Sequence, residues 1–129
     1  MSKTIRAVRL DPDGTLTDLQ LPPGAGLVEA LRKAVGGWVE IAHYARPEGN
    51  RRLSVAVDAD GALTKEQNLY ATSLVNAIYR KQLPDPLYGT VVLLGALDET
   101  RQHTDVPPQL HEVLPKVMNA LKDRYSTIA

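Results

Sequence analysis

The apolar positions up to residue 45 switch between the period of a strand and that of a helix. Residues 4–10 and 16–21 place apolar side chains at roughly every second position, which predicts two strands joined by a turn. Residues 27–35 carry apolar side chains at helical spacing, and the glycine pair that follows can end the helix in the left-handed conformation. Residues 38–45 alternate again and predict a third strand.

The pattern after residue 45 predicts another hairpin, a helix and a buried strand. Residues 53–57 form a strand that we expect to pair with 38–45 through a polar loop at 46–52. Asn68 is suited to the N-cap of a helix that runs to about residue 80, because its side-chain oxygen can accept a hydrogen bond from the first turn. Residues 91–94 are apolar without alternation, which is typical of a central strand buried on both faces.

The C-terminal segment contains a proline that a regular helix excludes. Residues 98–108 are polar and rich in helix breakers, and they predict a surface loop. Pro115 lacks a backbone N–H and its ring clashes with the preceding turn. We therefore expect a short helical turn over 108–113 and a final helix that begins at Pro115.

These elements predict one domain over residues 1–129, in the order β-β-α-β-β-α-β-α. The fold class is α/β with an α+β-like arrangement, because two hairpins are interrupted by helices. We expect a mixed sheet of about five strands with three helices covering at least one face.

The composition narrows the classes of function. The chain balances 15 Lys and Arg against 15 Asp and Glu, so no net field draws it to a polyanion, and nucleic-acid binding is disfavoured. The absence of cysteine excludes disulfides and a cysteine nucleophile. No run of about 18 apolar residues and no signal-peptide core is present. We expect a soluble cytoplasmic protein with no membrane partner, no metal and no cofactor.

One cassette, Asp-x-Asp-Gly, occurs twice, at 11–14 and at 58–61. The first copy imitates the nucleophile loop of haloacid-dehalogenase-type phosphatases, with Asp11 attacking phosphorus and Asp13 moving a proton. The second copy favours a plainer interpretation, because Asp and Gly are the residues that tight turns between strands require. We therefore interpret both copies as hairpin-type turns. A small magnesium-dependent phosphate-ester hydrolase using Asp11 and Asp13 is kept as the alternative function.

Three segments together carry a family resemblance. They are Val-Gly-Gly-Trp-Val-Glu at 35–40, Asp-Gly at 60–61 followed by Asn68 and Ala-Thr at 71–72, and Gly-Thr-Val-Val at 89–92. This set resembles a small domain family of unknown function met chiefly in bacteriophages, plasmids and actinobacterial genomes. Residues 64–67 depart from the pattern, since relatives usually approach the Asn with a more apolar or proline-containing segment. The resemblance implies a compact stand-alone domain, and it supplies no catalytic residues.

Five positions are candidates for binding a ligand. Gly37 can let a ligand approach the backbone, although helix capping also explains the glycine pair. Glu40 follows Trp38 on one strand and is either a solvated carboxylate or an acid beside an aromatic wall. Asn68 and Thr72 lie one helical turn apart and can converge on one polar spot. Gly89 completes the set through the family motif.

The leading hypothesis is therefore a non-enzymatic binding or interaction module that acts on a protein or small-molecule partner. A structural homodimer, formed through a sheet edge or a helix face, is a third hypothesis.

Overall fold

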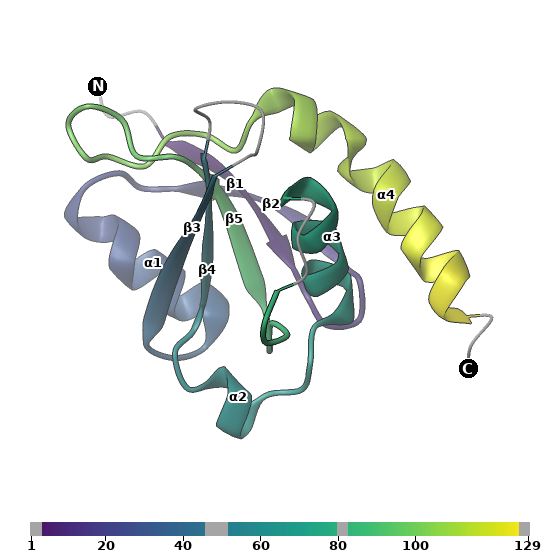
Figure 1. Cartoon of the computed structure of the whole chain (residues 1–129). Coiled ribbons are helices and arrows are strands. Elements are labelled where there is room, and N and C mark those ends of the chain that lie inside the picture. Colours follow the sequence, from purple (N-terminus) through teal and green to yellow (C-terminus); the bar gives the residue numbers. More distant parts are fainter. Residues whose placement is uncertain (1–3, 46–51, 80–82, 127–129) are drawn as a thin grey trace.

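A five-stranded sheet lies between helices on both of its faces, as the computed structural model shows for residues 4–45, 52–79 and 83–126 (Figure 1). The helix that follows the first hairpin covers one face, and the two longest later helices cover the other. The elements are β1 (Ile5–Leu10), β2 (Leu16–Leu21), α1 (Ala25–Val35), β3 (Val39–Ala45), β4 (Arg52–Asp58), α2 (Gly61–Thr64), α3 (Leu69–Tyr79), β5 (Val91–Gly95) and α4 (Pro108–Ser126).

The strand order is β2-β1-β5-β4-β3, and every pairing among the described strands is antiparallel. The α+β-like fold class and the single domain agree with the prediction, but the expected mixed sheet does not. The reason lies in the connectivity: two hairpins supply four strands, and β5 enters between them antiparallel to both neighbours. The β3–β4 pairing confirms the second hairpin, while residues 46–51 of its loop lie outside the described residues.

The central strand β5 divides the interior into two hydrophobic clusters. Val91 and Leu93 face α3 and α4, whereas Val92 and Leu94 face α1, and all four side chains are fully buried. Burying a side chain of this size stabilises a fold by about 1.5–3 kcal/mol. The prediction of a central strand without alternation is therefore confirmed.

The two copies of the Asp-x-Asp-Gly cassette have different structures. The first closes the β1–β2 hairpin: the Asp11 N–H donates to the Thr15 carbonyl at 3.0 Å, and the Gly14 N–H donates to the Asp11 carbonyl at 2.9 Å. Gly14 has a φ of 89°, which a residue with a side chain rarely adopts. The segment thus continues into a strand, whereas the nucleophile loop of the phosphatases leads towards a helix.

The second copy corrects our expectation of two hairpin-type turns. It ends β4 and leads directly into the single helical turn α2, in which the Lys65 N–H donates to the Gly61 carbonyl at 2.8 Å. The Asp58 side chain accepts a hydrogen bond from the Asp60 N–H at 3.0 Å and fixes the bend. Asp and Gly are as well suited to the start of a helical turn as to a hairpin, so the composition alone did not distinguish them.

The C-terminal segment also differs from the prediction. α4 is continuous and Pro115 lies inside it. Leu110 and Leu114 precede the proline, Met118 follows it, and all three pack on one hydrophobic cluster. Pro115 itself is exposed, so it does not disturb the packing of these three side chains. Their burial outweighs the one backbone hydrogen bond that the proline removes.

Among the described residues, no helix combines the length and the hydrophobicity that crossing a bilayer requires.

Candidate functional site

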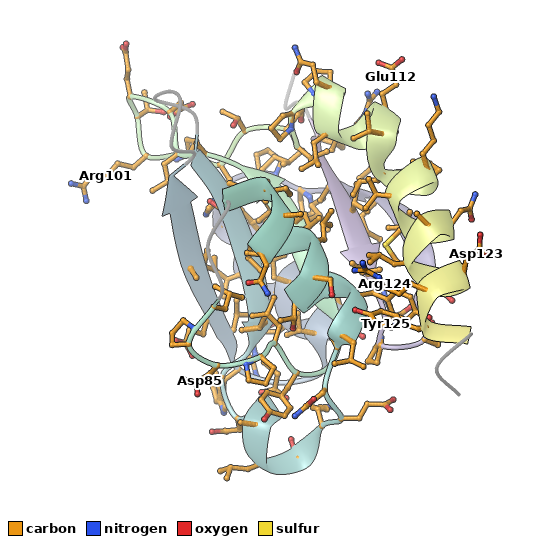
Figure 2. All side chains as sticks on the ribbon, turned by 45° about the vertical axis from the view of Figure 1, so that its right-hand side comes forward. Asp85, Arg101, Glu112, Asp123, Arg124 and Tyr125 are labelled. Atoms are coloured by element: carbon orange, nitrogen blue, oxygen red, sulfur yellow. The ribbon has the colours of Figure 1, made fainter. Side chains whose placement is uncertain are left out.

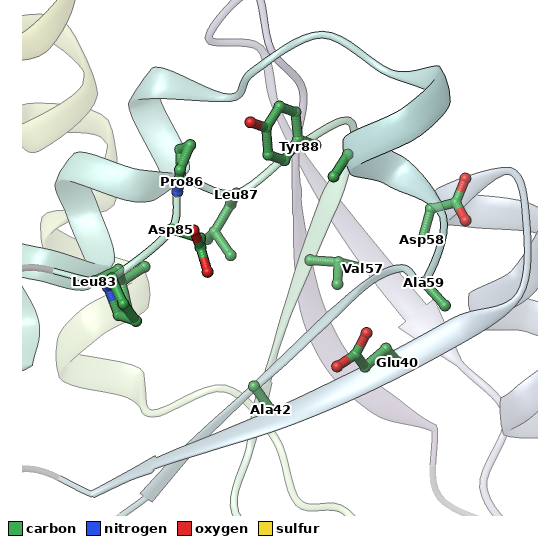
Figure 3. A pocket seen from close by; sticks show the side chains of 12 residues that line it. Glu40, Ala42, Val57, Asp58, Ala59, Leu83, Asp85, Pro86, Leu87 and Tyr88 are labelled. Carbon is green, nitrogen blue, oxygen red and sulfur yellow. The ribbon is translucent and has the colours of Figure 1, made fainter.

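A groove of about 430 Å³ lies beside the end of the β3–β4 hairpin. Its volume is within the range of about 300–1,000 Å³ that is usual for ligand pockets. One side is formed by β3, β4 and the start of α2, and the other by the segment at 83–88 that leads towards β5 (Figure 3). The apolar lining consists mainly of Ala42, Val57, Leu83, Pro84, Pro86 and Leu87.

Three carboxylates line the groove, and they come from three separate segments. Glu40 is on β3, Asp58 ends β4, and Asp85 lies between two prolines. Figure 3 shows the Glu40 and Asp85 carboxylates directed into the space from opposite sides, while the Asp58 carboxylate turns away from Glu40. The described lining residues include no Lys, Arg or His, so the groove is acidic.

Asn68 holds the 83–88 segment from behind. Its side-chain amide donates hydrogen bonds to the Gly89 carbonyl at 2.8 Å and to the Leu10 carbonyl at 3.0 Å, and its backbone N–H donates to the Leu87 carbonyl at 2.7 Å. Its Oδ1 accepts from the Ala71 N–H at 2.9 Å, which confirms the N-cap prediction. The residue is fully buried, so it supports the groove and does not line it.

Thr72 and Gly89 complete this support. The Thr72 hydroxyl donates to the Asn68 carbonyl at 2.8 Å and accepts from the Leu87 N–H at 2.9 Å, so Asn68 and Thr72 do converge on one polar spot. Gly89 is buried with a φ of 71°, and its N–H donates to the Glu66 carbonyl at 2.8 Å. Hydrogen bonds to Leu87 and Gly89 therefore fix one wall of the groove.

Glycines near the groove allow close packing where a side chain would not fit. Gly36 has a φ of 78° and donates to the Arg32 carbonyl at 2.8 Å, which confirms the helix cap. A Cβ on Gly37 would lie 2.7 Å from the Asp58 carboxylate, and a Cβ on Gly61 would lie 3.3 Å from Tyr88. Gly37 thus leaves room for the Asp58 side chain, which is only 8% exposed.

A comparison with family models places nearly the whole chain in a known domain family. The model described as Domain of unknown function (DUF3846) matches residues 5–125, which is nearly the whole chain. The chain belongs to this family. No curated protein matches the chain. No solved structure matches it either.

The predicted site residues of this DUF3846 member differ in whether they line the groove or support it from behind. Glu40 lines it, Gly37 lies against a lining carboxylate, and Asn68, Thr72 and Gly89 hold its wall. The sequence interpretation did not name Asp58, Asp85 or Tyr88 as binding candidates, although all three line the groove. An acidic residue between two prolines, flanked by Leu83 and Leu87, was the available signal.

Trp38 does not form a wall beside Glu40. The Arg32 guanidinium carbon lies 4.2 Å from the centroid of the Trp38 ring, in a cation–π arrangement with α1. Trp38 remains 65% exposed and therefore belongs to the outer surface.

The aspartates of the first cassette are bound by their neighbours. Asp11 Oδ1 accepts from Arg9 Nε at 3.0 Å and from the Thr90 hydroxyl at 2.7 Å, which connects the hairpin to the start of β5. Hydrogen bonds from Thr15, with a smaller contribution from the Lys122 charge, hold the pKa of Asp13 below its usual value. A proton donor at neutral pH needs a shift in the opposite direction.

His103 and His111, whose side-chain contacts are described, lie in different parts of the fold and have different partners. His111 Nε2 and Asp18 Oδ1 are 2.7 Å apart and connect α4 to β2, while His103 Nδ1 lies 3.4 Å from the Gly95 carbonyl. Within the described ranges, His, Asp and Glu side chains form no group of three that could hold a metal ion.

Proposed function

We propose that the protein is a non-enzymatic binding module whose groove accepts a positively charged group carried on an apolar body. The observation that carries the proposal is the lining itself, in which the exposed Glu40 and Asp85 carboxylates stand among apolar side chains without a described cation. An unbalanced negative field in a concave site attracts a cation, and the apolar walls favour the carbon skeleton attached to it.

Two further features support binding. The wall at 83–88 is held by hydrogen bonds from Asn68 and Thr72, so little order has to be gained when a ligand enters. The described lining residues include no Ser, Thr, Cys or His, the side chains that most often act as nucleophile or base. The proposal retains a cytoplasmic location, which the composition favours, and an association with phages and plasmids, which the family resemblance implies.

The test uses two probes that share one apolar body and carry opposite charges. 4-Phenylbutylamine and 4-phenylbutyrate are titrated separately into the protein, and amide chemical shifts are recorded by NMR. We expect the amine to shift the signals of Glu40, Ala42 and Leu87, and the carboxylate to leave them unchanged. Equal binding of both probes would contradict the proposal.

A variant with Glu40→Gln and Asp85→Asn tests the role of charge. Both side chains are exposed, so folding should be unaffected, and the affinity for the amine should fall roughly tenfold. Glu112→Gln is the matched control, because Figure 2 shows Glu112 on α4, well away from Asp85. An unchanged affinity in the double variant would rule out the acidic groove as the site.

A further inference from the structure

β3 forms an open edge of the sheet next to the groove. It is the last strand in the order β2-β1-β5-β4-β3, and among the described residues it pairs only with β4. An edge strand presents unpaired backbone groups that can pair with another extended chain. Glu40 and Ala42 of this strand also line the groove, so the edge and the groove form one continuous surface.

The direction of the free backbone groups follows from the register. The Trp38 carbonyl accepts from the Ala59 N–H at 2.7 Å, so the backbone groups of residue 38 face β4. Because this direction alternates along a strand, those of Glu40 face β4, and those of Val39 and Ile41 face the open edge. The groove side chains and the free amides therefore belong to alternate residues.

A chain added at this edge would place every second side chain on the groove face. Side chains directly opposite one another on neighbouring strands lie about 4.5–5.5 Å apart at Cβ, which suits an ion pair. A Lys or Arg opposite Glu40 would lie in the acidic groove, with Asp85 on its far side. A second copy of this chain fits less well, because antiparallel pairing of two β3 strands places two acidic grooves on one face.

We propose that the partner is an extended basic segment of another protein, which adds to β3 as a sixth strand and inserts a Lys or Arg into the groove. This inference rests on the proposed function and specifies the form of the ligand. Backbone hydrogen bonds to Val39 and Ile41 supply the pairing, and Glu40 with Asp85 selects the positive side chain.

The experiment uses the peptide acetyl-Thr-Val-Thr-Lys-Thr-Val-Thr-amide and two N-methylated forms of it. Each form is methylated on one of the two alternating sets of amides, so only one form loses the groups that face β3. We expect that form to bind roughly tenfold more weakly than the parent, and the other to bind nearly as well. Hydrogen exchange at Val39 and Ile41 should slow when the parent peptide is bound.

Charge reversal at Glu40 provides the second measurement. We expect Glu40→Lys to lose the lysine peptide and to gain the peptide in which glutamate replaces lysine. Equal binding of the two N-methylated forms, together with retained binding of 4-phenylbutylamine, would overturn strand addition and leave the proposed function standing. Failure of both the amine and the peptides to bind would overturn both. A dimer through β3 that the peptide does not dissociate would also overturn this inference.

Discussion

At the scale of single residues, the Asn68 side chain connects three separate segments near the groove by hydrogen bonds. It caps α3 through Ala71 and bonds two carbonyls, Leu10 at the end of β1 and Gly89 before β5. Both amide hydrogens and the amide oxygen have partners, as a fully buried amide requires. The polarity that marked Asn68 as a ligand-binding candidate is therefore satisfied within the protein.

Replacing Asn68 by Ala should lower the free energy of unfolding by about 2–4 kcal/mol. The helix loses its cap, and two buried carbonyls lose their donor. Urea unfolding followed by circular dichroism measures the change. Gln67→Ala is the neighbouring control, whose exposed side chain predicts a change below about 0.5 kcal/mol. Equal stabilities of the two variants would show that the buried network contributes little.

At the scale of elements, local patterns predicted most boundaries correctly. Leu16–Leu21 and Gly36 were identified because alternation and a left-handed cap are properties of neighbouring residues. Pro115 was misplaced because contacts of α4 with distant strands override a local rule. The strand order and the groove depend on contacts between segments far apart in sequence, such as β3 and 83–88. A local sequence pattern cannot predict such contacts.

The interior proline of α4 leads to a prediction of increased stability. Pro115 is exposed, and in a helix interior Pro is about 3 kcal/mol less favourable than Ala. We expect Pro115→Ala to raise the free energy of unfolding by about 1–3 kcal/mol, and the exposed Lys116→Ala control to change it by less than about 0.5 kcal/mol. A loss of stability in Pro115→Ala would contradict this prediction.

At the scale of the whole molecule, β5 packs into both hydrophobic clusters, as its neighbours β1 and β4 also do. Leu31 of α1 belongs to one cluster and Leu114 of α4 to the other, and each is almost completely buried. Successive residues of β5 pack into opposite clusters. Disruption of either cluster should therefore also disrupt the central strand on which the other cluster packs.

Leu31→Ala and Leu114→Ala should each lower the stability of one common transition by about 2–5 kcal/mol. Urea unfolding is followed by circular dichroism and by the fluorescence of Trp38, the single tryptophan. The two signals should change together in both variants, because the transition is shared. Separate midpoints for fluorescence and circular dichroism in Leu31→Ala would show that the α1 layer unfolds independently.

The central position of β5 also has a consequence for synthesis on the ribosome. The strand at the middle of the sheet is the last of the five described strands to be made, and β1 and β4 have no shared partner until it arrives. The two hairpins must therefore remain apart, each with an unpaired inner edge, until residues 91–95 have left the exit tunnel. Sheet closure is thus postponed until this one strand joins both halves.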